Sequence, residues 1–140
     1  MTLDLSSLKK SIHSFERAIE ILKTLPIQYH MQEEEINVLK SGVVQNFEFT
    51  YELCWKFMKR WLEENTSDAF NTNVSRKQLF RYAGEYLLIS NFDSWVKYHE
   101  MRNKTSHTYD VVVSNEILQY TEGLLLDAKA LLTALEQKND

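Results

Sequence analysis

One segment of the chain gathers the side-chain types that phosphodiester chemistry requires. It runs from Asp93 to Tyr109 and contains Arg102, Asn103 and His107. A guanidinium group binds two phosphate oxygens at once and stabilises the charge of a pentacoordinate transition state. An imidazole moves a proton near neutral pH. Because RNA supplies its own nucleophile, the 2′-hydroxyl, the pattern favours metal-independent RNA cleavage or the binding of a nucleotide phosphate.

The spacing of these residues sets a condition on the structure. Arg102 and His107 are five positions apart, which places them about 140° apart on a straight helix. They converge only if the helix ends near Ser106 and the chain turns inward, whereas Asn103 and His107 share one helical face. The absence of apolar periodicity after Met101 favours such an ending. In the alternative interpretation, Arg102 caps the helix C-terminus and His107 is an ordinary surface histidine.

Length and composition restrict the elements that can position this segment. The 140 residues fit one domain, 1–140, and the net charge of −4 argues against a broad electropositive surface but not against a small basic site. Three glycines and one proline disfavour a β-sandwich or barrel and exclude glycine-rich phosphate loops. A single cysteine excludes a disulfide framework and a thiolate zinc site. With no His-Glu-x-x-His or Asp-x-Asp motif in the sequence, we expect no metal site and no cofactor.

The chain shows no pattern for a membrane. Its longest purely aliphatic runs are three residues, such as Leu124 to Leu126, whereas a membrane span needs roughly 20. No signal-peptide core follows the first ten residues. We therefore expect a cytoplasmic protein that does not contact a membrane.

Apolar residues recur at three- and four-residue steps, which predicts an all-α fold. The architecture expected is an antiparallel up-down helical bundle with four main helices and a shorter one. The expected helices run from Leu5 to about Leu25, where Pro26 ends the first; from Glu33 to Glu64; from the N-cap Ser75 to about Leu88; from 90–93 to about Ser106; and from the N-cap Ser114 to about Leu135, followed by a polar tail from Gln137. The connectors expected between them are 28–32, 65–73 and 109–113.

Two blocks of the sequence resemble a known family. Arg102-Asn103-Lys104-Thr105-Ser106-His107-Thr108-Tyr109 is similar to the Arg-x4-6-His motif of HEPN domains, helical-bundle proteins of which many are metal-independent ribonuclease toxins. Together with 47–56 and Asp93-x-Trp95, this block resembles the nucleotidyltransferase substrate-binding protein family, a HEPN branch usually encoded beside a separate minimal nucleotidyltransferase chain. The resemblance covers nearly the whole chain.

The resemblance implies partners and a modification. It implies a homodimer whose helices frame a cleft, and a 2:2 complex with the minimal nucleotidyltransferase, forming a toxin–antitoxin pair. In related pairs the transferase adenylylates a motif tyrosine and silences the ribonuclease, and Tyr109 occupies that position. The alternative for Tyr109 is a core residue whose ring packs under the connector.

The first functional hypothesis is a ribonuclease. Arg102 would stabilise the phosphorane, His107 would act as general acid or base, and Asn103 would orient the scissile phosphate. Glu52 would orient a base or bind the 2′-hydroxyl, although a surface ion pair with Lys56 four residues on is an equal interpretation.

The second hypothesis is a non-catalytic subunit that binds nucleotide or other substrate for the transferase. Arg102 and His107 would then hold a nucleotide phosphate, and the aromatic rings of Trp95 and Tyr98 would stack on its base. A third hypothesis is a purely structural interaction protein, in which these polar residues serve packing.

Overall fold

Six α-helices and one 3₁₀ turn form the part of the chain that the computed structural model describes, residues 2–66 and 74–139. The elements are α1 (Ser6–Gln28), α2 (Glu33–Asn65), α3 (Arg76–Glu85), α4 (Phe92–Asn103), the turn η1 (Thr105–His107), α5 (Val111–Leu118) and α6 (Thr121–Gln137). No β-strand occurs within these ranges. The predicted all-α class is confirmed. None of the described helices has the length and apolarity that crossing a bilayer demands.

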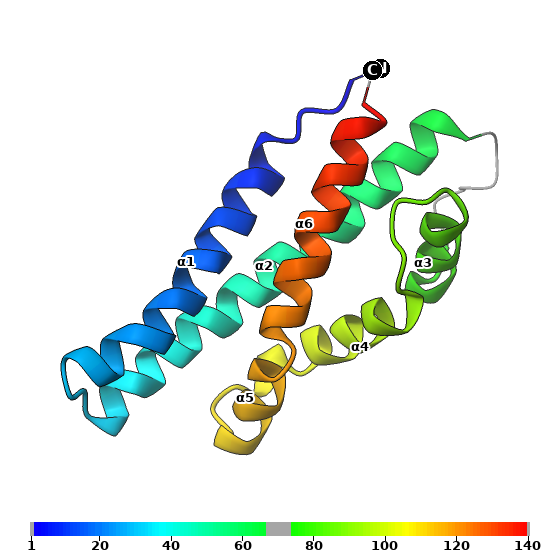
Figure 1. Cartoon of the computed structure of the whole chain (residues 1–140). Helices are drawn as coiled ribbons and strands as arrows, with labels where there is room; N and C mark the ends of the chain where they lie inside the picture. The colour runs from blue at the N-terminus through cyan, green and yellow to red at the C-terminus, as the bar shows by residue number, and fades with distance from the viewer. Residues whose placement is uncertain (1, 67–73, 140) are drawn as a thin grey trace.

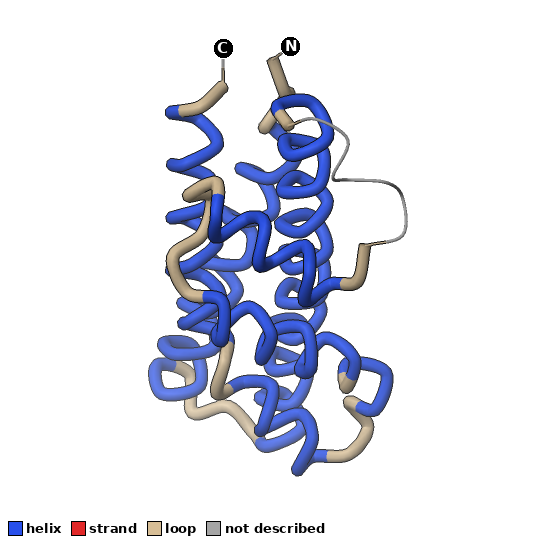
Figure 2. The backbone as a smooth tube through the Cα atoms, turned by 90° about the vertical axis from the view of Figure 1, so that its right-hand side faces the viewer, coloured by secondary structure: helices blue, strands red, loops and turns tan. Residues whose placement is uncertain are grey.

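The core lies where α1, α2 and α6 pack together (Figure 1). Figure 2 shows the same helices running alongside one another, with the shorter elements on one side of them. Phe47 of α2 is fully buried and packs edge-on against Phe15 of α1 and Tyr98 of α4. Helix α2 contacts every other described helix and η1, so its position fixes theirs.

Helix α2 begins as the sequence predicts, at three glutamates. Glu35 reaches back so that its Oε1 accepts a hydrogen bond from the Gln32 N–H at 2.8 Å. A carboxylate there satisfies a free N–H and complements the positive end of the helix dipole. The predicted connector 65–73 lies outside the described residues from position 67 onward.

The ends of α1 and α3 differ slightly from the prediction. Helix α1 continues past Pro26 to Gln28, because a proline in the last turn removes only one backbone hydrogen bond, and the Tyr29 N–H still donates to Leu25 O. Helix α3 ends at Glu85 rather than near Leu88. There the N–H groups of Leu87 and Leu88 bond back to the carbonyls of Gly84 and Ala83, with Leu87 at φ 62° in the left-handed conformation.

Helix α4 also ends earlier than predicted. It begins after Asn91, whose Oδ1 accepts from the Ser94 N–H at 3.4 Å, and it ends at Asn103 rather than near Ser106. The next three residues form η1, where the His107 N–H bonds to Lys104 O. The chain thus leaves the α-helix between Arg102 and His107, which is the kind of ending that their spacing requires.

The predicted fifth helix is two helices, and its predicted cap is wrong. Asp110 caps α5 through a 2.9 Å bond from the Val112 N–H to its Oδ1, while Ser114 is buried inside the helix. The sequence interpretation failed because a run of valines disfavours a helix start by propensity, whereas Asp110 is a strong N-cap. Helix α5 then ends at Leu118, whose carbonyl accepts from the Thr121 hydroxyl at 2.8 Å.

Candidate functional site

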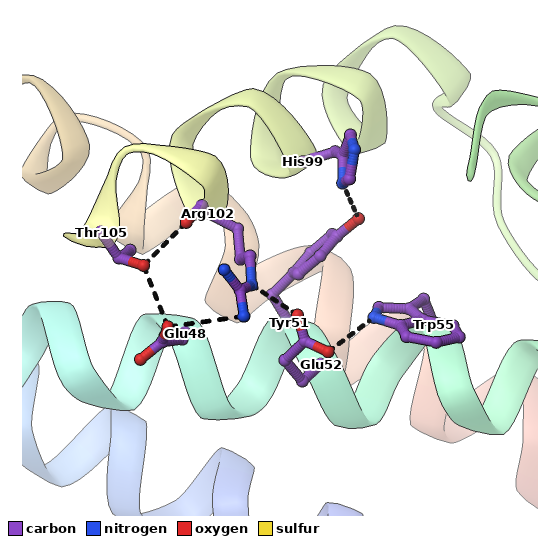
Figure 3. Close-up of polar contacts among 7 residues, drawn as sticks. All are labelled: Glu48, Tyr51, Glu52, Trp55, His99, Arg102 and Thr105. Carbon is purple, nitrogen blue, oxygen red and sulfur yellow. Dashed lines mark hydrogen bonds and ion pairs between the residues drawn. The ribbon is translucent and has the colours of Figure 1, made fainter. Parts of the chain in front are cut away.

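The side chain of Arg102 lies between two glutamates of α2 (Figure 3). Its Nε donates to Glu52 Oε1 at 2.5 Å, and its Nη2 lies 3.6 Å from Glu48 Oε2. All three side chains are about one-third exposed or less, at 35%, 26% and 31% respectively. Partial burial strengthens such charge-assisted contacts beyond those of surface ion pairs. The guanidinium is therefore held in place from the α2 side, and it is not a cap of its own helix.

The glutamate nearer the start of α2 also ties down the turn after α4. The Thr105 hydroxyl lies 3.0 Å from Glu48 Oε2 and 2.7 Å from the Arg102 carbonyl oxygen. Its single proton is shared between these two acceptors, one on α2 and one at the end of α4. This contact explains why η1 leaves the line of α4 at this point.

The other glutamate is linked to an aromatic ring. Trp55 Nε1 donates to Glu52 Oε2 at 3.0 Å, so both carboxylate oxygens of Glu52 have partners. The guanidinium carbon of Arg76, at the start of α3, lies 3.4 Å from the centroid of the Trp55 ring. Glu52 thus binds Arg102 and Trp55 in place of the ion pair with Lys56 that the sequence left open.

A histidine and a tyrosine meet on the other side of Arg102. Tyr51 Oη lies 2.8 Å from His99 Nδ1, and the two rings are 5.9 Å apart (Figure 3). Burial raises the pKa of Tyr51 far above its usual value, so the hydroxyl keeps its proton, and the His99 tautomer sets which of the two groups donates. Burial, and then the charges of Arg76 and Arg102, lower the pKa of His99 below its usual range, although Glu52 opposes this. His99 is accordingly neutral at pH 7.

His107 and Tyr109 lie at the surface. His107 is exposed in η1, Tyr109 is 84% exposed, and their ring centroids are 6.2 Å apart in an edge-to-face arrangement. Tyr109 is therefore not the core residue that the sequence left open. Asn103 is exposed at the last position of α4. Between positions 74 and 139, no hydrogen bond or ion pair joins Arg102 to His107.

The stacking role predicted for Trp95 and Tyr98 is not supported. The two residues are 1% and 3% exposed, and their rings pack edge-on against each other at 5.4 Å. The Tyr98 hydroxyl donates to Asp127 Oδ2 at 2.5 Å, and an added Cβ at Gly123 would lie 3.0 Å from it. A base cannot reach either ring without unfolding the core, because the helix face that carries them is turned inward.

Sequence reasoning missed Glu48, Tyr51, Trp55, His99 and Arg76 as parts of this site. Two signals were present: Glu48 and Glu52 are four apart, and His99 and Arg102 are three apart, so each pair shares a helical face. Neither spacing reveals that this face of α2 packs against this face of α4.

The described residues offer no group of three or more His, Cys, Asp or Glu side chains placed to hold a metal ion. Cys54 is fully buried, and burial raises its thiol pKa, so it is a small core residue.

Comparison with known proteins places the chain in a family. Residues 3–137 match the nucleotidyltransferase substrate binding protein-like family. The chain belongs to this family. The resemblance inferred from the two sequence blocks is thereby confirmed, and the family name implies a nucleotidyltransferase partner.

The chain is similar to a named protein and to two solved structures. A protein of Haemophilus influenzae named probable ribonuclease HepT is 38% identical over 107 residues, covering 74% of this chain and 71% of the relative. A solved H. influenzae structure, described as the fold of a substrate-binding domain of a nucleotidyltransferase, superposes with a TM-score of 0.89 at 29% identity, covering 95% of this chain and 99% of that one. A Thermus thermophilus structure at 24% identity and TM-score 0.63, covering 86% and 98%, shares the fold.

The neutral state of His99 predicts a pH dependence of stability. The pKa of His99 is about 6.5 in the unfolded chain and lower in the folded protein. As the pH falls below about 6.5, His99 therefore takes up its proton in the unfolded chain before it does so in the folded one, and the free energy of unfolding decreases. Urea unfolding measured from about pH 7.5 to about pH 5 should therefore show a smaller loss of unfolding free energy for His99→Gln than for the wild type. His13→Gln, at an exposed position of α1, is the control. Equal losses for His99→Gln and the wild type would contradict the assignment.

Proposed function

We propose that this chain is the HEPN-type ribonuclease subunit of a two-component toxin–antitoxin system, acting in the cytoplasm beside a separate minimal nucleotidyltransferase. The observation that carries the proposal is the arrangement at the end of α4. Arg102 is oriented by two carboxylates, and an exposed His107 follows in the turn that ends the helix. The H. influenzae relative named a probable ribonuclease supports the same activity.

The reaction assigns a distinct task to each group. His107 takes the proton of a 2′-hydroxyl, the 2′-oxygen bonds to the adjacent phosphorus, and the bond from phosphorus to the 5′-oxygen breaks. The 5′-oxygen takes a proton from water, and His107 releases the proton it took to solvent. The products are a 2′,3′-cyclic phosphate and a 5′-hydroxyl. Arg102 stabilises the added negative charge of the phosphorane, and Asn103 donates a hydrogen bond that orients the phosphate. Glu52 positions Arg102 by its 2.5 Å contact with Nε.

Removing the imidazole should abolish this activity. We expect His107→Ala to lower the RNA cleavage rate about 10²- to 10⁴-fold while leaving thermal unfolding nearly unchanged, because the side chain is exposed. The assay is cleavage of a labelled RNA in EDTA. His13→Ala is the matched control, since His13 is also exposed but lies on α1. Full cleavage by His107→Ala, or dependence on added Mg²⁺, would refute the assignment.

We propose that the same site is regulated at Tyr109. Tyr109 presents its ring to solvent beside His107, so an AMP group transferred to its hydroxyl would cover the imidazole. The transfer forms a bond from the Tyr109 oxygen to the α-phosphorus of ATP and releases pyrophosphate. The added phosphate also brings a negative charge that competes with RNA for Arg102.

Co-expression with the cognate nucleotidyltransferase should yield a chain heavier by one or more AMP units. Intact-protein mass spectrometry should show the increase for the wild type and its absence for Tyr109→Phe, and the modified protein should cleave RNA more slowly. Tyr29→Phe, at another exposed tyrosine, is the control and should still be modified. If the wild-type chain stays unmodified when it is co-expressed with an active transferase, the proposed modification of Tyr109 is wrong.

We also propose that the subunit is a homodimer, joined 2:2 to the transferase. Valines at the start of α5 and in α2 are exposed, with Val38 at 71% and Val112 at 74%. Two adjoining hollows near them share Ser41 and Thr108 and reach Tyr109. An apolar surface of this kind beside the motif suits a second copy, which would place two motifs across one cleft.

Light scattering at micromolar concentration should give twice the 16.6 kDa chain mass. A stable dimer of this kind buries on the order of 2,000 Å². We expect Val112→Glu to shift the mass toward the monomer, because it places a charge in the interface. Leu126→Glu, equally exposed but on α6, should leave the mass unchanged. A wild-type monomer would contradict the proposal.

The second candidate is a non-catalytic subunit that holds a nucleotide for the transferase. The solved H. influenzae structure described as a substrate-binding domain favours it. In that case Arg102 binds a nucleotide phosphate and no bond is broken. Purified protein incubated with RNA in EDTA distinguishes the two, since cleavage supports the ribonuclease, and nucleotide binding without cleavage supports the binding subunit.

A further inference from the structure

A groove of about 590 Å³ lies between α1 and α2, next to Arg102 but apart from the motif. Lys10 and Ser14 of α1 line one wall, and Asn46, Phe49, Glu52 and Lys56 of α2 line the other. Its volume falls within the range of small-molecule sites, about 300–1,000 Å³. Apart from Glu52, which positions Arg102, no residue that was given a role in the proposed reaction lines this groove.

An aromatic ring stands open in the groove. Phe49 is 53% exposed, although its neighbours on α2, Thr50 and Tyr51, are fully buried. An exposed phenyl ring forms no hydrogen bond with water, but its flat face is a surface on which a nucleic-acid base can stack. Phe49 supplies the open ring that Trp95 and Tyr98 do not.

The charges around the ring suit a polyanion. Neither Lys10 nor Lys56 forms an ion pair among the described residues, although Lys10 helps to lower the pKa of Asp4. The one carboxylate in the groove belongs to Glu52, whose two oxygens already bind Arg102 and Trp55. Glu52 shares the charge of Arg102 with Glu48, so the positive charge that attracts a phosphate to the groove comes from Lys10 and Lys56.

The groove is continuous with the candidate catalytic site through Glu52. This side chain lines the groove and also contacts Arg102 Nε at 2.5 Å, and Phe49 lies between Glu48 and Glu52 in the sequence of α2. A strand whose scissile phosphate sits on Arg102 can therefore lay its neighbouring nucleotide across Glu52 onto the Phe49 ring.

We infer that this groove binds an unpaired nucleotide of single-stranded RNA next to the scissile bond, with its base stacked on Phe49 and its phosphates near Lys10 and Lys56. The inference rests on the proposed ribonuclease function and names its substrate class. A paired base has both faces covered by its neighbours, so the groove selects single strands.

The polar pair in the groove predicts little preference among bases. The Ser14 hydroxyl donates to Asn46 Oδ1 at 2.8 Å, and Asn46 Nδ2 donates to Gly42 O at 2.9 Å. Because each of these two side chains already has a partner within the protein, we expect recognition to depend mainly on stacking, which every base provides. The contribution of Phe49 should therefore be similar for all four bases.

Fluorescence anisotropy with a labelled 2′-O-methyl oligonucleotide, which resists cleavage, tests the inference on the full chain. Phe49→Ala should weaken single-strand binding roughly 5- to 100-fold, the range that loss of one base stack gives, and Phe49→Trp should retain binding. Lys10→Glu with Lys56→Glu should weaken binding and flatten its salt dependence. Leu126→Ala, at an exposed apolar position of α6, is the control and should bind as the wild type does.

Several outcomes would overturn the inference. One is unchanged single-strand binding by Phe49→Ala, and another is an equal loss when Phe49→Ala binds a duplex of the same sequence. A third is a change in the mass of Phe49→Ala by light scattering, which would make the groove a contact with a second copy. Binding of free AMP through Phe49 that the oligonucleotide does not displace would assign the groove to a free nucleotide instead. RNA bound through Phe49 but never cut in the wild type would refute the ribonuclease and leave the groove intact.

Discussion

The packing of α2 against every other described helix is the constraint on which the rest of this structure depends. Burial of Phe47 and Tyr51 fixes the rotation of α2 about its axis. A helix turns by about 100° per residue, so Glu48 and Glu52, each one position later, emerge on the flank that faces α4. The core thereby determines where two negative charges stand, and these charges determine where Arg102 points.

The two carboxylates hold Arg102 unequally, and that difference bears on the proposed chemistry. Glu52 contacts Nε at 2.5 Å, whereas Glu48 lies 3.6 Å from Nη2 and also receives the Thr105 hydroxyl. The tight contact orients the guanidinium plane. The looser contact is the one that a phosphate can replace, because its oxygens match the outer edge of the guanidinium fork. A single arginine can thus be held by two carboxylates at rest and exchange the looser of these contacts for an anion.

The polar groups of the site divide into a buried layer and an exposed layer. Tyr51 is fully buried and His99 is half-buried beside Arg102, and both keep their neutral forms through this burial. His107 and Tyr109 stand in solvent, on the turn and connector after α4. This division suits a site whose inner residues are fixed by the fold. The exposed His107 and Tyr109 remain accessible to the substrate phosphate, the modification or the second subunit proposed above.

The sequence by itself determined the all-helical class, the approximate helix ranges and the Arg102–His107 motif, because apolar periodicity, caps and short motifs are local properties. Only the tertiary structure decided that Trp95 and Tyr98 face the core, that Asp110 rather than Ser114 caps α5, and that Arg102 meets two glutamates 50 or more positions earlier in the chain. Which of two amphipathic faces is covered depends on the helix that packs against it. The spacing within a single helix does not contain that information.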